Sequence, residues 1–146
     1  PGVDIVHNVQ EYPWPLAANT WDKTICQHVI EHIDDVAGFM KEIHRIAKDG
    51  AVIEITTPHF SSINSWTDPT HKKHLSLQWY KLFTEGYLAA QTGKFGCISS
   101  TVSFGKSLRA KIGKLIARFR GLEKWEKSHA FVYPGMDITT LLKVIK

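Results

Sequence analysis

The sequence predicts an α/β protein built on a mostly parallel sheet, and three observations point to that class. Residues 21–27 carry β-branched side chains at their centre, as a short buried strand does. Residues 36–47 repeat apolar side chains at spacings of three and four, which predicts an amphipathic helix. Residues 51–56 return to β-branched side chains before Pro58 ends the pairing. A strand, a helix and a second strand in this order form a crossover between parallel strands.

Capping signals stand at both ends of the predicted helix. Asp34 and Asp35 precede the apolar repeat, and aspartate is a favoured N-cap residue. Lys48 falls in the last turn, where a cation complements the helix dipole, and Gly50 suits the left-handed C′ position. The helix is therefore expected to run from the two aspartates to this glycine.

The rest of the chain is assigned from the same kinds of pattern. Residues 2–9 are rich in β-formers, which predicts a strand. Residues 59–77 form a long polar connection, and connections of that length are usually functional or disordered. The remaining expectations are a helix over 78–91, a strand over 94–104, a helix over 105–121, an irregular stretch over 125–135 and a final strand over 137–145.

Length and composition favour one folded domain. The chain has 146 residues with 43% hydrophobic content, which supports a single packed domain over residues 1–146. There is no apolar run of about 18 residues, so no membrane span is expected. Two cysteines, Cys26 and Cys97, are too few for a disulfide framework. A reduced, cytoplasmic chain is the expectation.

The positive net charge of +4 is concentrated in residues 105–121, which contain six cations and no acid. Apolar residues recur there at helical spacing, and Ser107 is a plausible cap. One interpretation is a helix packed on the sheet with a solvated basic face. The other is a site for an anionic partner, such as a membrane surface, a phosphorylated substrate or nucleic acid. Specific nucleic-acid binding is not expected, because no recognition motif accompanies the charge.

Polar side chains follow the two crossover strands where each one ends. Parallel sheets bind ligands at the carboxyl ends of their strands, and Gln27, His28 and His59 lie at those ends. His28 and His32 have a spacing that suits metal binding on a helix. Because Glu31 is misplaced for an H-E-x-x-H motif and the segment straddles a strand end, no metal site is expected.

Three residues are the predicted catalytic groups: His59, Asp68 and His71. A histidine beside a carboxylate can act as an oriented base. The alternative is that Asp68 caps a turn at Pro69 while His71 bonds to backbone.

The run from Tyr12 to Pro58 resembles the class I S-adenosylmethionine-dependent methyltransferases, in particular the broad type 11 group. That group commonly has P-F/W-P, N-S-F-D, H-V-L-E-H and E-I-x-R-V-L-K-P-G-G in this order, and this chain has PWP, NTWD, HVIEH and EIHRIAKDG. The segment PHFSSINSWTDPTHKKHLSL resembles one branch of the group, and YPGMDITTLLKVIK resembles its last strand. The resemblance implies a Rossmann-like methyltransferase fold with an antiparallel C-terminal edge.

The resemblance also implies S-adenosylmethionine as cofactor and assigns residues to it. It places Asn8 and Val9 by the adenine, and Gln27 and His28 along the methionine part. A turn role for Asn8 and a capping or packing role for Gln27 and His28 are the alternatives. Glu31 and His32, which belong to the HVIEH motif, are assigned to the substrate pocket, with a structural role for His32 as the alternative.

The chain departs from the family pattern at its start. It shows no G-x-G-x-G loop and no second strand ending in an acid, so it looks like an N-terminally truncated methyltransferase lacking two strands. The expected function is methyl transfer to a small or glycan-like acceptor. The alternative is a non-catalytic scaffold that binds a protein through an open sheet edge or an anionic partner through residues 105–121. An open edge also predicts self-association, or a rearranged pairing of residues 2–9 with the strand at 21–27.

Overall fold

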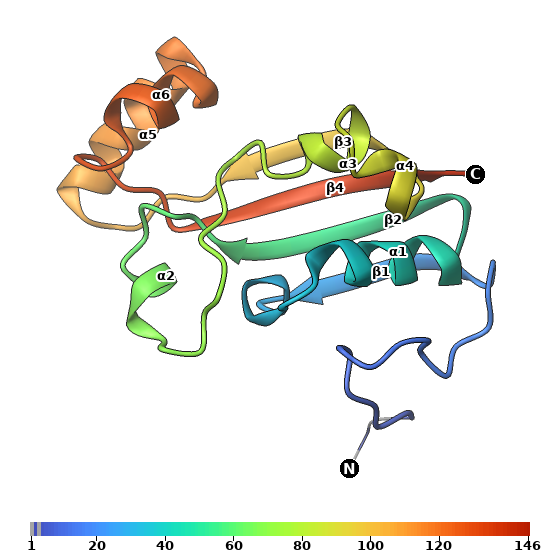
Figure 1. Cartoon of the computed structure of the whole chain (residues 1–146). Helices are drawn as coiled ribbons and strands as arrows, with labels where there is room; N and C mark the ends of the chain where they lie inside the picture. The colour runs from blue at the N-terminus through green and yellow to red at the C-terminus, as the bar shows by residue number, and fades with distance from the viewer. Residues whose placement is uncertain (1, 3) are drawn as a thin grey trace.

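A mixed four-stranded sheet organises the computed structural model, which describes residues 2 and 4–146 (Figure 1). The strands are β1 (Trp21–Gln27), β2 (Ala47–Pro58), β3 (Lys94–Val102) and β4 (Asp137–Ile145), in the order β1-β2-β4-β3. β1 pairs with β2 in parallel, and β4 runs antiparallel to both β2 and β3. Three strands therefore point one way, and the C-terminal edge is antiparallel as expected.

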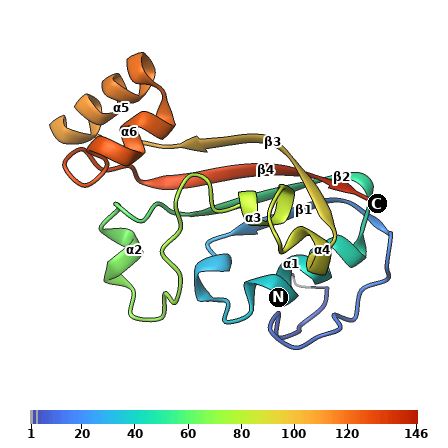
Figure 2. The same cartoon turned by 45° about the horizontal axis from the view of Figure 1, so that its top comes forward.

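Helices cover one face of this sheet. α1 (Val36–Ile46) lies on that face with the short α3 (Lys81–Thr84) and α4 (Ala89–Thr92) (Figure 2). Alternate residues of β2 and β4 are buried, so the covered face forms the core and the other face is half-exposed. The remaining helices are η1 (Ile30–His32), α2 (Asn64–Thr67), α5 (Leu108–Arg120) and α6 (Leu122–His129).

α1 begins as the capping signal predicts. The Asp35 side chain accepts a hydrogen bond from the Gly38 amide at 2.8 Å. A Cβ atom on Gly38 would lie 2.3 Å from the Asp35 carboxylate, so only glycine leaves room for this cap. The helix buries Phe39, Met40 and Ile43 completely, and each such side chain contributes about 1.5–3 kcal/mol of burial free energy.

The predicted end of α1 is wrong by about a turn. The helix stops at Ile46 and β2 begins at Ala47, so the chain passes from helix to strand without a glycine cap. Gly50 does have a positive φ, of 78°, but within β2. The strand is longer than expected because its first residue, Ala47, pairs with Trp21 before an irregularity in the register, and regular pairing with β1 resumes at Val52.

The strand predicted over residues 2–9 does not form in the part of that segment that the structure describes, and Val3 lies outside the described residues. Residues 5–8 are irregular, and a turn follows in which the Glu11 amide donates to the Asn8 carbonyl at 2.9 Å. No hydrogen bond joins residues 4–9 to β1 among the backbone bonds of the described chain. The rearranged pairing is therefore wrong, and the outer edge of β1 stays open.

Two further expectations are corrected. The helix predicted over 78–91 is split into α3 and α4 by a turn at Gly86, where the backbone comes so close to Leu82 that a Cβ would lie 2.7 Å from its Cα. The stretch over 125–135 that was expected to be irregular overlaps most of α6, which buries Trp125 completely. α5 and α6 form a hairpin beyond the end of the sheet (Figure 1).

Candidate functional site

The carboxyl ends of β1 and β2 lie side by side and open into one polar hollow. Gln27 pairs with Thr56, and the His28 amide donates to the Thr56 carbonyl at 2.9 Å. His28 has a φ of 53°, a left-handed conformation that costs a non-glycine residue about 1 kcal/mol. This conformation turns the chain directly from β1 towards η1, which carries Glu31 and His32.

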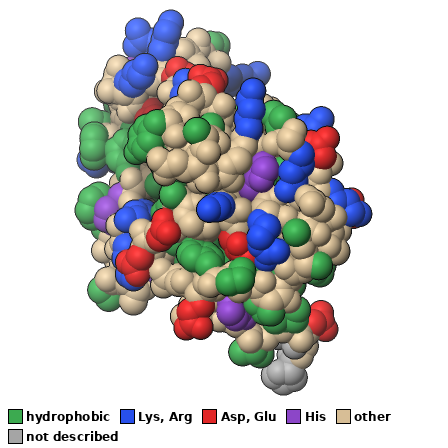
Figure 3. All heavy atoms as spheres, turned by 45° about the vertical axis from the view of Figure 1, so that its right-hand side comes forward, with side chains coloured by type: hydrophobic (Ala, Val, Ile, Leu, Met, Phe, Trp, Pro, Cys, Tyr) green, Lys and Arg blue, Asp and Glu red, His purple; other side chains and the backbone are tan. Residues whose placement is uncertain are grey.

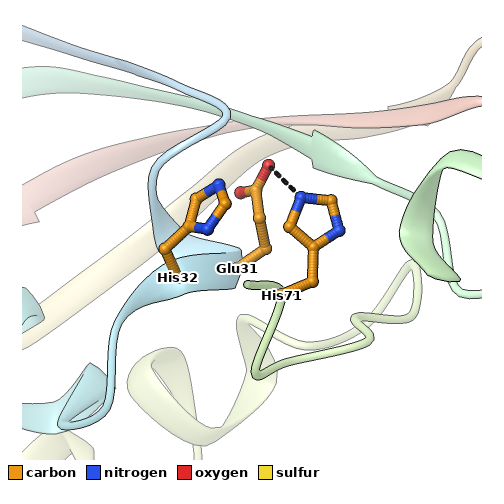
Figure 4. A group of neighbouring side chains, drawn as sticks. All are labelled: Glu31, His32 and His71. Carbon is orange, nitrogen blue, oxygen red and sulfur yellow. Dashed lines mark ion pairs between the residues drawn. The ribbon is translucent and has the colours of Figure 1, made fainter. Parts of the chain in front are cut away.

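Glu31 is the buried centre of the site. Its side chain is 1% exposed, and its Oε2 accepts a hydrogen bond from the Thr57 hydroxyl at 3.0 Å. Its Oε1 has no hydrogen-bond partner among the described residues, although His28 Nδ1 lies 3.3 Å away. His71 Nε2 lies 4.0 Å from the same oxygen (Figure 4). Because a buried polar atom without a partner costs free energy, this oxygen is available to a bound group.

His71 points its Nε2 into the same hollow. Its Nδ1 lies 3.1 Å from the Ser65 carbonyl oxygen, which can only accept a hydrogen bond. Nδ1 therefore carries the proton in the neutral ring, and Nε2 is left as the acceptor. That nitrogen lies 3.9 Å from Asp68 Oδ2, so two carboxylates face it.

Asp68 caps its turn, which was the alternative to a catalytic role, and it also lies close to His71. Its Oδ1 accepts from the Thr70 amide at 2.8 Å and from the Thr70 hydroxyl at 2.7 Å, which caps the turn. These hydrogen bonds from Thr70 hold the pKa of Asp68 below its usual range. The carboxylate is therefore charged near neutral pH and stands beside His71.

His32 joins the two loops that form the hollow. Its Nδ1 lies 3.0 Å from the Thr70 hydroxyl, and its ring meets that of His71 edge to face at 4.7 Å. The Glu31 carbonyl accepts from the amides of Lys72 and Lys73. These contacts support a structural role for His32, which was the alternative to its place in the substrate pocket.

The hollow has a volume of about 500 Å³, within the range of small-molecule sites. Its lining residues are His28, Glu31, His32, Pro58, Asn64, Thr67, Asp68 and His71. Glu31, His32 and His71 each bring one ligand atom within 4.8 Å of the others, so these three could hold a divalent cation. The expectation of no metal stays a prediction.

His59 lies elsewhere, in a buried network between β2 and α6. Its Nδ1 accepts from the Ser61 amide at 3.2 Å, and its Nε2 donates to Glu126 Oε1 at 2.9 Å. Burial alone would raise the pKa of Glu126, but the hydrogen bonds from His59 and the Leu77 amide outweigh burial and lower it. Since both ring nitrogens are bonded and the side chain is fully buried, the geometry gives His59 a structural place.

The residues assigned to the adenine lie outside the polar hollow. Asn8 uses its side chain in local hydrogen bonds to Glu11 and to the Gln10 amide. Val9 lines a separate apolar hollow of about 280 Å³ beside β1, together with Ile25 and Cys26 among others. Burial raises the pKa of the Cys26 thiol to about 12, so that cysteine is not a nucleophile.

Sequence reasoning missed three contributors to the site. Thr57 orients Glu31, Thr70 holds Asp68, and the Ser65 carbonyl selects the tautomer of His71. Thr70 lies within the DPTH segment and could have been found there. A backbone carbonyl such as that of Ser65 leaves no signal in a sequence.

Comparison with known proteins identifies the family. A family model described as "Methyltransferase domain" matches residues 2–98. The chain therefore belongs to the methyltransferase-domain family, within the class I S-adenosylmethionine-dependent methyltransferases. S-adenosylmethionine is the cofactor of that class, and the Rossmann-like α/β fold is confirmed. No curated protein matches the sequence.

Solved structures share the fold at low sequence identity. A SAM-dependent methyltransferase from Archaeoglobus fulgidus has a TM-score of 0.60 and 20% identity, covering 95% of this chain and 66% of its own. The [4+2]-cyclase SpnF has a TM-score of 0.58 and 11% identity, covering 95% and 54%. A phosphoethanolamine N-methyltransferase 2 from Haemonchus contortus has a TM-score of 0.55 and 16% identity, covering 96% and 36%. The chain thus spans two thirds of these proteins or less.

Within the described residues, no helix is long and apolar enough to cross a membrane.

Proposed function

We propose that this chain carries the acceptor side of S-adenosylmethionine-dependent methyl transfer to a hydroxyl or amine of a small or glycan-like molecule. The observation that carries the proposal is His71, whose Nδ1 is committed to the Ser65 carbonyl. Its Nε2 is therefore a free proton acceptor, and it faces a polar hollow at the strand ends where this fold binds ligands.

The chemistry follows from this geometry. S-adenosylmethionine supplies an electrophilic methyl carbon when bound. The hollow would hold the acceptor with its oxygen or nitrogen beside His71 Nε2, where it would receive the methyl group that the cofactor would supply. His71 Nε2 takes the proton that the acceptor loses, and Asp68 and Glu31 stabilise the imidazolium that results.

Of the four residues assigned to the cofactor, two have positions that support the assignment and two do not. Gln27 and His28 lie at the end of β1 beside the hollow, and the His28 side chain is half-exposed, so both could line the methionine part. Asn8 and Val9 enter the proposal through the family resemblance alone, since the Asn8 side chain is engaged within its own turn.

A second candidate function is a non-catalytic scaffold. β1 pairs on one side only, and Trp21 and Ile25 are exposed on it. An open edge of this kind can accept a strand from a protein partner or from a second copy. The single-domain boundary at residues 1–146 and a cytoplasmic location also remain proposals.

Calorimetric titration with S-adenosylmethionine, and separately with S-adenosylhomocysteine, tests the proposal first. Micromolar binding followed by transfer of a labelled methyl group to a hydroxyl or amine acceptor supports it. Binding without transfer to any acceptor in the panel favours the scaffold. No binding at high protein concentration contradicts the claim that this chain acts as an enzyme.

A further inference from the structure

One interpretation of the sequence had α5 packed on the sheet with its basic face in solvent. In the structure a different face of α5 is buried. Its buried residues are the small ones, Ala110, Gly113 and Ala117. A Cβ atom on Gly113 would lie 2.8 Å from the Tyr133 carbonyl oxygen, so the helix approaches that backbone as closely as only glycine permits. Packing of the small face leaves Leu108, Leu115 and Phe119 on the outside, while Ile112 and Ile116 are half-buried.

Those large residues form one stripe on the exposed side. Leu108, Leu115 and Phe119 are 74%, 55% and 78% exposed. They recur at spacings of seven and four, which places them on one face of a helix. Ala110 and Ala117 follow Leu108 and Leu115 by two residues, and two residues turn a helix by about 200°. The exposed stripe therefore lies opposite the buried face.

Cations flank the stripe on both sides. At 3.6 residues per turn, Lys111 and Arg118 lie to one side of it, and Arg109 and Arg120 lie to the other. The segment from 105 to 121 has six exposed cations in all, and none of them forms an ion pair with another described residue. Figure 3 shows Lys and Arg side chains at the upper end of the molecule, where the α5–α6 hairpin lies.

We propose that this exposed face of α5 binds the surface of an anionic lipid bilayer. The helix lies in the plane of the interface, with Leu108, Leu115 and Phe119 among the acyl chains. The flanking cations meet the phosphates of the headgroups, since their long stems reach past the apolar stripe. The proposal does not depend on methyl transfer.

The cations beside the stripe favour a lipid surface over a second copy of the chain or nucleic acid as the partner of this face. A second copy placed on the stripe would bring two sets of unpaired cations together, which repel. Nucleic acid satisfies cations but gains nothing from a central stripe of leucine and phenylalanine, since it presents phosphates to such a surface. An anionic bilayer offers acyl chains to the apolar stripe and phosphates to the flanking cations.

Vesicle co-sedimentation of the full chain tests the proposal. We expect binding to phosphatidylcholine vesicles that contain phosphatidylglycerol, weak binding to phosphatidylcholine alone, and loss of binding at high salt. Phe119→Gln should weaken binding about ten-fold, because one buried phenylalanine is lost. Each of Lys111→Gln and Arg118→Gln should weaken it about five-fold.

Two control variants test whether vesicle binding depends on this face of α5 or on surface charge and hydrophobicity in general. Tyr87→Gln removes an aromatic residue that is 69% exposed but lies outside the hairpin, and Lys94→Gln removes an exposed cation of β3. Both should bind vesicles as the parent chain does. Circular dichroism confirms that each variant keeps its helices.

Three results would overturn the proposal. One is vesicle binding that the two controls reduce as much as Phe119→Gln does. Another is no binding to anionic vesicles combined with salt-dependent binding to RNA. The third is a vesicle-free, concentration-dependent dimer that Phe119→Gln abolishes, which would assign the stripe to a second copy.

Discussion

The polar hollow and the α5–α6 hairpin show opposite exceptions to normal burial: the hollow buries a polar group, and the hairpin exposes an apolar one. In the hollow, the carboxylate of Glu31 is buried with one oxygen unbonded, where an apolar residue or a full set of hydrogen bonds would be expected. In the hairpin, Phe119 is exposed while alanine and glycine are buried. Neither arrangement favours the stability of the folded chain. These are the two places where we propose that a ligand binds, a small acceptor in the hollow and a lipid surface at the hairpin.

The largest expected effect is at His71. His71→Gln removes the proton acceptor, and general-base catalysis is worth about 10²- to 10⁴-fold, so methyl transfer should fall by that factor. Binding of S-adenosylhomocysteine, measured by calorimetry, should change little. His44→Gln, on α1 and far from the hollow, is the matched control. Equal losses in both variants would remove His71 from the mechanism.

The α5–α6 hairpin depends on Trp125, so replacing this tryptophan should cause the largest loss of stability. Trp125 is fully buried, packs against Phe104 and donates to the Tyr133 carbonyl at 3.0 Å. Trp125→Ala should lower the free energy of unfolding by about 3–5 kcal/mol, measured with urea. Trp66→Ala, at a 60% exposed tryptophan, should cost clearly less. If the two losses match, the packing of Trp125 does not hold the hairpin.

Glu126 ties the hairpin to the sheet through His59, and its contribution should depend on pH. The folded-state pKa of Glu126 lies below its unfolded value of about 4.3. Its contribution is therefore complete above that pH and is lost as the pH falls through the folded pKa. Glu126→Gln should cost about 1–2 kcal/mol at pH 7. The difference from the parent chain should shrink on acidification, and a constant difference would contradict the pKa direction.

The smallest expected effect is that of metal removal. If His71 Nε2 accepts a proton, it is not committed to a cation, so treatment with EDTA should leave methyl transfer unchanged. The measurement compares initial rates before and after chelation. A loss that zinc restores would show that the Glu31, His32 and His71 group holds a cation, and would replace the proposed base.

Local elements were predictable because their signals are local. Asp35 and Ser107 cap α1 and α5 as the sequence indicates, and each accepts a hydrogen bond from an amide three residues on. β1 and β4 keep their predicted bounds, since β-branched and apolar residues mark both strands directly. The burial predicted for β1 is wrong, because β1 lies at the edge of the sheet and buries only Cys26. The grouping of Asp68 with His71 was also predictable, because three residues separate them.

Contacts between distant residues decided the rest. His59 was expected at the site, but its hydrogen-bond partner Glu126 lies 67 positions away in the sequence. No local sequence pattern could have predicted that hydrogen bond. The apolar repeat of α5 predicted an amphipathic helix, and one interpretation had it packed on the sheet with its basic face solvated, but the small residues are buried instead. The close approach of Gly113 to Tyr133 decided which face packs. Sequence periodicity alone thus determined that this chain would form its crossover and its basic helix. Only tertiary packing decided which histidine faces the hollow and which side of the helix meets solvent, because both depend on segments that the fold brings together.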